Sequence, residues 1–134
     1  MEASDTHKVT LAIPAKPDYV VLARLALSAV CRLSPLAPEE VADLKLAITE
    51  AATYIMGGER RHVARVDGEG QALLTFTFEV GDDSLALGVS GAELPTVSDE
   101  ERELSLALIR ATVDSHEYSG GTMRLVKHLD YSAE

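Results

Sequence analysis

Cysteine is nearly absent from this chain. The 134 residues include one, Cys31, which excludes an internal disulfide framework and favours a reducing compartment, the cytoplasm. Because Cys31 lies in an apolar helical pattern with no activating base, we interpret it as a core residue. Positive charge is also scarce, with 12 lysines and arginines against 22 acidic residues and a net charge of −10. This balance argues against direct binding to nucleic acid or to an anionic membrane surface.

Long hydrophobic runs are missing as well. The longest, residues 19–31, is interrupted by Arg24 and is too short to cross a bilayer. The first ten residues are polar, so we expect no signal peptide. No repeat or linker divides the chain, and a composition of 46% hydrophobic and 25% charged residues predicts one globular domain spanning residues 1–134.

Familiar catalytic motifs do not occur. The four histidines show no metal-ligand spacing with one another or with the cysteine, so we expect no metal site. There is no Gly-x-x-x-x-Gly-Lys phosphate loop and no Gly-x-Ser-x-Gly nucleophile elbow. What remains is Glu50, a carboxylate in the middle of an otherwise apolar helical segment, and such residues are usually only solvent-exposed.

Hydrophobic periodicity predicts an α/β two-layer sandwich in the order β-α-α-β-β-α-β. Its helices would pack on one face of a mixed, mainly antiparallel sheet. The expected strands are residues 8–13, 72–80, 84–90 and 122–129, and the expected helices are residues 17–33, 38–56 and 99–114. The predicted buried stripes are Val41, Leu44, Ile48, Ala51 and Ile55 in the second helix, and Leu104, Leu108 and Ala111 in the third.

The third helix opens with an acidic first turn. Ser98 and Glu101 fit a capping box, with Asp99, Glu100 and Glu103 close by. A helix N-terminus presents unpaired N–H groups and partial positive charge, which also suits a bound phosphate. Two interpretations are open here: ordinary capping of a solvated helix, or an anion site that has been closed.

Residues 43–56, DLKLAITEAATYIM, resemble the N-box helix of the RsbW-type anti-sigma-factor serine kinases of the Bergerat-fold (GHKL) ATPase superfamily. In that family the helix reads like D-x-K-L-A-V-S-E-A-C-T-N-A-V. The positions that match in place are Asp43, Lys45, Leu46, Ala47, Glu50, Ala51 and Thr53. Residues 9–30 resemble the family's first strand and helix, and residues 104–129 its last helix and strand. The resemblance therefore implies a Bergerat-like fold over roughly residues 8–129.

The resemblance also assigns roles to single positions. Glu50 corresponds to the glutamate that activates the attacking hydroxyl or water. Tyr54 stands where the family has the asparagine that holds Mg²⁺, and a phenol is a bulky, poor ligand for that ion. Ser90 stands where the family has the aspartate that accepts the adenine amino group.

The glycines of the family's nucleotide site are replaced too. In the Asp-x-Gly-x-Gly box they become Ala92 and Leu94, and in the Arg-Gly-Leu-Gly-Leu stretch, residues 102–106 here, they become Glu103 and Ser105. Those glycines let phosphates approach the start of the helix. The resemblance therefore implies that the acidic first turn no longer receives a nucleotide, with Glu50 as a vestigial base and Tyr54 as a plug in the vacated pocket.

From these features we expect an anti-sigma-factor-like regulatory binding protein on a degenerate kinase scaffold, without ATP, Mg²⁺ or another cofactor. The family forms homodimers that bind a σ factor and release it when an anti-anti-sigma protein competes. Arg24 aligns with an arginine of the first helix that contacts such partners, although it could equally be an ordinary surface residue. The alternatives are an active ATP-dependent serine kinase acting on an anti-anti-sigma substrate, or a pocket for another small ligand. The cluster of Arg60, Arg61 and Arg65 is interpreted as a solvated loop.

Overall fold

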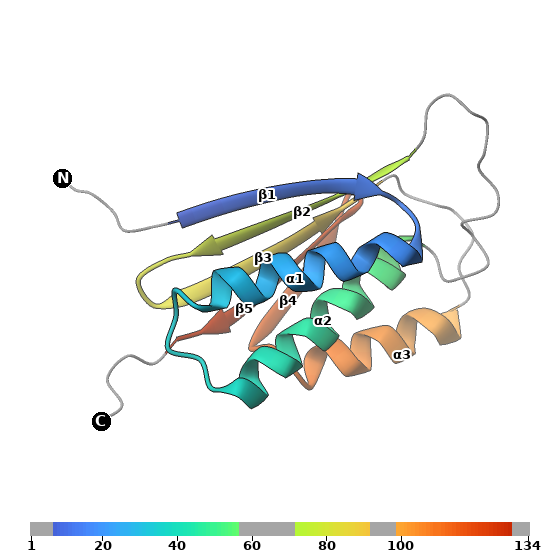
Figure 1. Cartoon of the computed structure of the whole chain (residues 1–134). Helices are drawn as coiled ribbons and strands as arrows, with labels where there is room; N and C mark the ends of the chain where they lie inside the picture. Colours follow the sequence, from blue (N-terminus) through green and yellow to red (C-terminus); the bar gives the residue numbers. More distant parts are fainter. Residues whose placement is uncertain (1–6, 57–71, 92–98, 130–134) are drawn as a thin grey trace.

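The computed structural model describes residues 7–56, 72–91 and 99–129 (Figure 1). Several sequence predictions lie outside these ranges: the arginine cluster, the residues Ala92 and Leu94, and the capping residue Ser98. The side chains of Asp99 and Glu101 also lie outside the description. The described ranges contain every other residue to which a role was assigned.

Five strands form one sheet in the order β1-β2-β3-β5-β4. Their bounds are His7–Pro14 for β1, Leu73–Val80 for β2, Ser84–Ser90 for β3, Ser115–Ser119 for β4 and Thr122–His128 for β5. All pairings among these described strands are antiparallel, whereas the sequence left room for a mixed sheet. The predicted two-layer α/β fold is confirmed.

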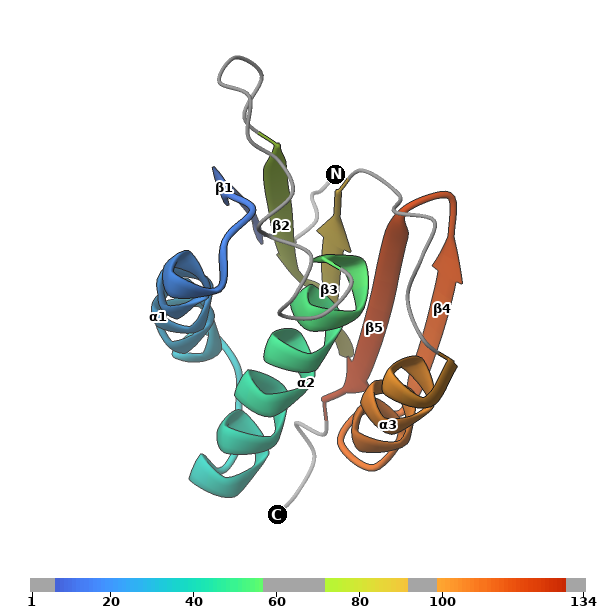
Figure 2. The ribbon, with the colours of Figure 1, turned by 90° about the vertical axis from the view of Figure 1, so that its right-hand side faces the viewer.

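The helices cover one face of the sheet, with α2 between α1 and α3 (Figure 2). A short 3₁₀ turn, η1 at Pro17–Tyr19, leads into α1 at Val20–Cys31, and the two others are α2 at Pro38–Met56 and α3 at Asp99–Arg110. Helix α2 begins where the sequence predicts, because Pro38 suits the first turn and the Glu40 carboxylate accepts the Ala37 N–H at 2.8 Å. The central place of α2 lets it contact both of the other helices and the sheet.

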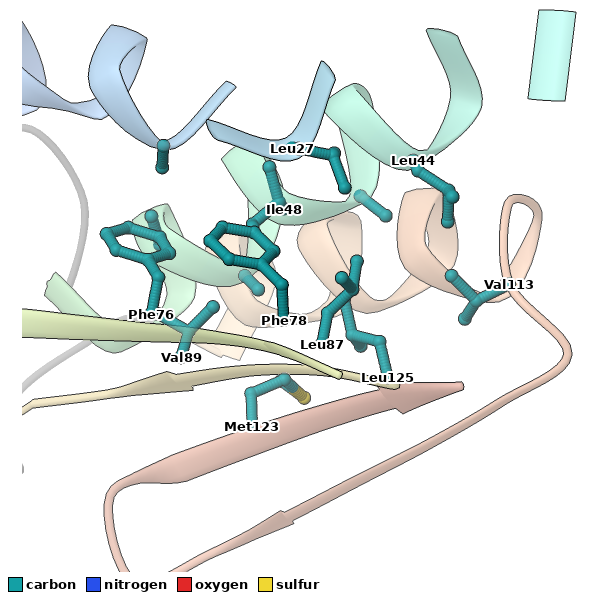
Figure 3. Packing of buried hydrophobic residues seen from close by; sticks show 14 of the residues in the cluster. Leu27, Leu44, Ile48, Phe76, Phe78, Leu87, Val89, Val113, Met123 and Leu125 are labelled. Atoms are coloured by element: carbon teal, nitrogen blue, oxygen red, sulfur yellow. The ribbon is translucent and has the colours of Figure 1, made fainter. Parts of the chain in front are cut away.

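The core lies between the helices and the sheet (Figure 3). Alternate side chains of β2 and β3, such as Phe76, Phe78 and Leu87, are fully buried because they face the helices. They meet Leu27 of α1 and Ile48 of α2, both 0% exposed. The stripe predicted for α2 is confirmed at Leu44, Ile48, Ala51 and Ile55, while Val41 at its start is half-buried.

The structure corrects the prediction after residue 110. Helix α3 ends at Arg110 rather than at 114, and strand β4 was missed. Strand β4 pairs with β5 through a tight turn in which Gly120 and Gly121 have φ of 58° and 84°. Such turns require positive φ, which glycine adopts without strain. The Gly-Gly pair was the signal that could have revealed this hairpin.

The buried stripe predicted for α3 was also wrong. Leu104 is 63% exposed, Ala111 is exposed and Leu108 is only half-buried. The buried positions are instead Ser105 and Ile109, followed by Thr112 just past the helix. The buried positions lie one residue further along the chain than predicted, and only Ile109 among them is apolar. The polar Ser105 can be buried because the Glu50 carboxylate accepts its hydroxyl proton.

Cys31 is buried, as predicted, and burial raises the pKa of its thiol, an effect that the nearby Lys45 ammonium partly opposes. Because the thiolate is the reactive form, we expect Cys31 to react slowly with a disulfide reagent in the native protein and rapidly in denaturant. The measurement is the rate of thiol modification at pH 8 with and without about 6 M urea. Equal rates would contradict this placement of the thiol in the core.

Candidate functional site

Glu50 lies on the side of α2 that faces α3. Its carboxylate Oε1 accepts a hydrogen bond from the hydroxyl of Ser105 at 3.0 Å. Ser105 is 5% exposed and Glu50 is half-buried, so solvent competes little for this contact. The structure thus joins two predicted site residues, and the carboxylate that would act as a base is engaged by a side chain of the same chain.

Tyr54 lies one turn further along α2 and is 8% exposed. Its ring packs edge-to-face on Tyr118 of β4, with centroids 5.0 Å apart and an interplanar angle of 65°. The guanidinium carbon of Arg102 sits 4.8 Å from the centre of the Tyr54 ring, a cation–π arrangement. We call Tyr54, Arg102 and Tyr118 the aromatic cluster. Its three side chains connect α2, α3 and β4.

Arg102 and Tyr118 were not singled out by the sequence analysis. Arg102 begins the Arg-Gly-Leu-Gly-Leu-like stretch, yet no role was given to it, and Tyr118 was hidden because β4 was missed. The Nε atom of Arg102 is buried and has no hydrogen-bond partner among the described residues. The contact that the structure shows for the Arg102 guanidinium is the one with the Tyr54 ring.

Ser90 is not brought together with Glu50. Along β3 the side chains that face the helices are Leu87 and Val89, so Ser90 points to the opposite face of the sheet. There its Oγ lies 2.9 Å from the Oγ1 of Thr122 on β5. Ser90 therefore contributes nothing to the space beside Tyr54.

Gly91 is the residue at the end of β3 that faces α2. A Cβ atom at this position would lie 2.9 Å from Cγ2 of Ile55 and 3.1 Å from Cδ2 of Leu74. A side chain here would have to displace core atoms of α2 and β2. Motif alignment assigned the adenine-binding position to Ser90, and the alternation of β3 turns the Ser90 side chain away from α2.

Arg24 lies on α1 and is half-buried. Its Nη1 donates a hydrogen bond to Oγ1 of Thr49 on α2 at 3.2 Å, and within the described part of the chain it makes no ion pair. The surface around it is apolar. Five of the nine exposed large hydrophobic side chains in the described ranges lie in residues 19–33: Tyr19, Val21, Leu22, Leu25 and Leu33. Exposed apolar side chains gathered in one segment are a feature of protein-binding faces.

Glu103, the remaining predicted site residue, is exposed on α3 and adds negative charge near the start of that helix. The described residues hold no group of three His, Cys, Asp or Glu side chains placed to bind a metal ion. In the same residues no helix is long and apolar enough to cross a membrane.

A five-stranded antiparallel sheet covered on one face by three helices, with a glutamate in the middle of the central helix, defines a GHKL-type ATPase scaffold. The family model for the histidine kinase-like ATPase domain matches residues 13–127. The chain therefore belongs to the histidine kinase-like ATPase family, and the resemblance to its RsbW-type members is confirmed.

Its relatives include serine-protein kinases named RsbW. The chain is 35% identical over 83 residues to RsbW of Listeria innocua, covering 62% of this chain and 49% of that protein. It is 33% identical over 85 residues to RsbW of Bacillus cereus, covering 63% and 48%. The chain thus spans about half the length of the curated relatives that it matches.

The Ser105–Glu50 contact leads to a prediction about stability. Ser105→Ala is expected to lower the free energy of unfolding by about 1 kcal/mol, because it leaves a half-buried carboxylate without its donor. The measurement is urea denaturation of Ser105→Ala, Glu50→Ala and the double variant. Strictly additive losses in the double variant would show that the two side chains do not interact.

Proposed function

We propose that this chain is an anti-sigma-factor-like regulatory binding protein on a kinase scaffold that no longer binds ATP. It acts in transcription control by binding a σ factor, an anti-anti-sigma protein, or both in competition. The proposal includes two features that the family resemblance implies: the protein works in the cytoplasm, and it forms a homodimer. The observation that supports the proposal is the aromatic cluster, because its central residue, Tyr54, stands where the resemblance implies the asparagine that holds Mg²⁺, and its ring is buried against Tyr118 and Arg102.

The residues at this position do not suit Mg²⁺. The ion requires compact oxygen ligands in octahedral geometry, and Tyr54 instead presents a buried ring. The Arg102 guanidinium stacked on that ring adds positive charge where a cation would have to sit. The Glu50 carboxylate, the one acidic group nearby on α2, accepts the Ser105 hydroxyl. These residues therefore do not support phosphoryl transfer at this site.

The binding role is supported by the surface of α1. This helix, VVLARLALSAVC, contains no carboxylate although the chain carries a net charge of −10. It exposes leucine and valine side chains around a half-buried arginine that has no ion-pair partner in the described residues. Arginine is enriched in protein interfaces, and the fully buried centre of such an interface is apolar. A partner surface that combines apolar and acidic residues would fit this face.

Binary binding measurements test the proposal. The purified chain is titrated with each alternative σ factor and each anti-anti-sigma protein of the source organism, and we expect at least one of them to bind. Arg24→Ala is expected to weaken that binding about tenfold or more, because truncating an anchor arginine at an interface costs about 2 kcal/mol.

The matched control is Arg32→Ala, which removes the exposed arginine that follows α1. We expect it to change binding little, and circular dichroism should show that both variants remain folded. Failure of every σ factor and anti-anti-sigma protein to bind would overturn the proposed function. Binding by Arg24→Ala equal to that of the unmodified chain would remove Arg24 from the interface.

The second candidate function, an active serine protein kinase, is favoured by one observation. Glu50 is retained in the middle of α2, at the position of the family's base. The contact with Ser105 and the burial of Tyr54 weigh against it. Nucleotide titration, discussed below, separates the two functions.

A further inference from the structure

Thr49 connects the two helices that border the proposed binding surface. Its hydroxyl donates to the carbonyl oxygen of Lys45 at 2.8 Å, one turn back along α2. The same Oγ1 accepts the hydrogen bond from Nη1 of Arg24 on α1 at 3.2 Å. Because the hydroxyl proton is committed to the backbone, a lone pair of Oγ1 is left to face the guanidinium.

This contact restricts the arginine. A free arginine side chain samples many rotamers, and ordering it at an interface costs about 0.5–1.5 kcal/mol. The bond to Thr49 fixes one of the five guanidinium N–H donors and leaves the others available to a partner. In the described residues no carboxylate competes for them, since Arg24 makes no ion pair there.

We propose that Thr49 is a positioning residue that holds Arg24 ready to receive a carboxylate of the protein partner. This inference rests on the proposed function and specifies the chemistry of its binding surface. The carboxylate would dock on Arg24, while apolar side chains of the same partner segment cover Leu25 of α1 and Leu46 of α2, both exposed. The charge pattern supports this occupant, because an acidic group meets less repulsion on the carboxylate-free α1 than elsewhere on a chain of net charge −10.

Substitutions of Thr49 test the inference. The probe is the σ factor or anti-anti-sigma protein that binds the unmodified chain in the titrations described above. Thr49→Val keeps the side-chain shape but removes the acceptor, and we expect about fivefold weaker binding. Thr49→Ser retains the hydroxyl and should bind like the unmodified chain.

Thr53→Val is the matched control. Thr53 lies one turn further along α2 and donates to the carbonyl oxygen of Thr49 at 3.0 Å, with no contact to Arg24. The Thr53→Val variant therefore loses the same kind of side chain–backbone bond as Thr49→Val. We expect its affinity for the partner to stay within about twofold of that of the unmodified chain. In an Arg24→Ala background, Thr49→Val should have no further effect, because there is no guanidinium left to position.

A readout without any partner completes the test. The order parameter of the Arg24 Nε–Hε group, measured by ¹⁵N relaxation, should fall toward the flexible range, below about 0.6, in Thr49→Val but not in Thr53→Val. An unchanged order parameter would overturn the inference, as would equal partner binding by Thr49→Val and the unmodified chain. If Arg24→Ala weakens binding and Thr49→Val does not, this inference fails while the proposed function stands. If no σ factor or anti-anti-sigma protein binds the unmodified chain, both fail.

Discussion

Calorimetric titration of the chain with Mg-ATP is expected to show no saturable binding at nucleotide concentrations up to about 1 mM. Two costs lead to this result. Loss of the charged acceptor for the adenine amino group costs about 1.5–3 kcal/mol. Moving the buried Tyr54 ring into water to seat a metal ion costs about as much again. Together they weaken a micromolar site on the order of a thousandfold.

The titration needs a positive reference and a restored variant. RsbW of Listeria innocua, a serine-protein kinase by name, serves as the reference under identical conditions. Tyr54→Asn, which returns the family's residue, is expected to stay silent, because Ser90 still stands in place of the family's adenine-binding aspartate and supplies no charged acceptor. Micromolar binding of Mg-ATP by the unmodified chain would overturn the proposed loss of nucleotide binding and favour the kinase.

Tyr54→Ala is expected to destabilise the protein by about 3–5 kcal/mol, the usual cost of removing a large buried ring. The ring is 8% exposed and contacts both Tyr118 and Arg102, so its loss removes the centre of the aromatic cluster. For a domain of this size, such a loss lowers the melting temperature by about 10–20 °C. Differential scanning calorimetry or urea denaturation measures the change.

Tyr54→Phe is the control, because it keeps the ring and its contacts and removes only the hydroxyl. We expect it to lose less than half as much stability as Tyr54→Ala. A loss below about 1 kcal/mol in Tyr54→Ala would mean that the ring is not packed in solution. In that case the pocket would be open, and the main support for the proposed function would disappear.

Most of the architecture was predictable because the elements of the first ninety residues follow simple periodicities. Helix α2 has a regular apolar stripe and a proline–glutamate start, so its bounds and most of that stripe followed directly. Val41 is nevertheless only half-buried, and Ala47 and Tyr54 are buried outside the predicted stripe. Strands β2 and β3 alternate strictly, which also revealed their hairpin. Past residue 98 the patterns were ambiguous. The buried face of α3 includes the polar Ser105, whereas Leu104 on the neighbouring face is exposed, so hydrophobic periodicity selects the wrong face. Strand β4 is a short, mostly polar edge strand whose strongest signal is Gly120-Gly121.

For the candidate site, the sequence predicted only which positions differ from the motifs of the family. Motif alignment identified Glu50, Tyr54 and Ser105 as positions of interest, yet it could not show that Ser105 donates to Glu50 or that Tyr54 is stacked against Arg102. It also placed Ser90 beside them, whereas the pleat of β3 turns Ser90 to the far face of the sheet. Which side chain meets which depends on the packing of α2, α3 and β4, elements far apart along the chain.

The sequence by itself determined the family and the helix-on-sheet architecture, and it showed which residues stand where the resemblance implies nucleotide contacts, because each of these depends on local pattern or residue identity. The tertiary structure decided which side chains these residues contact. Ser105 looks like a surface residue in the sequence, and it is buried because Glu50 offers an acceptor for its hydroxyl group. Arg102 is half-buried, with its guanidinium over the ring of Tyr54. The physical reason is that burial of a polar side chain is favourable only with a partner, and the partner here comes from a different helix.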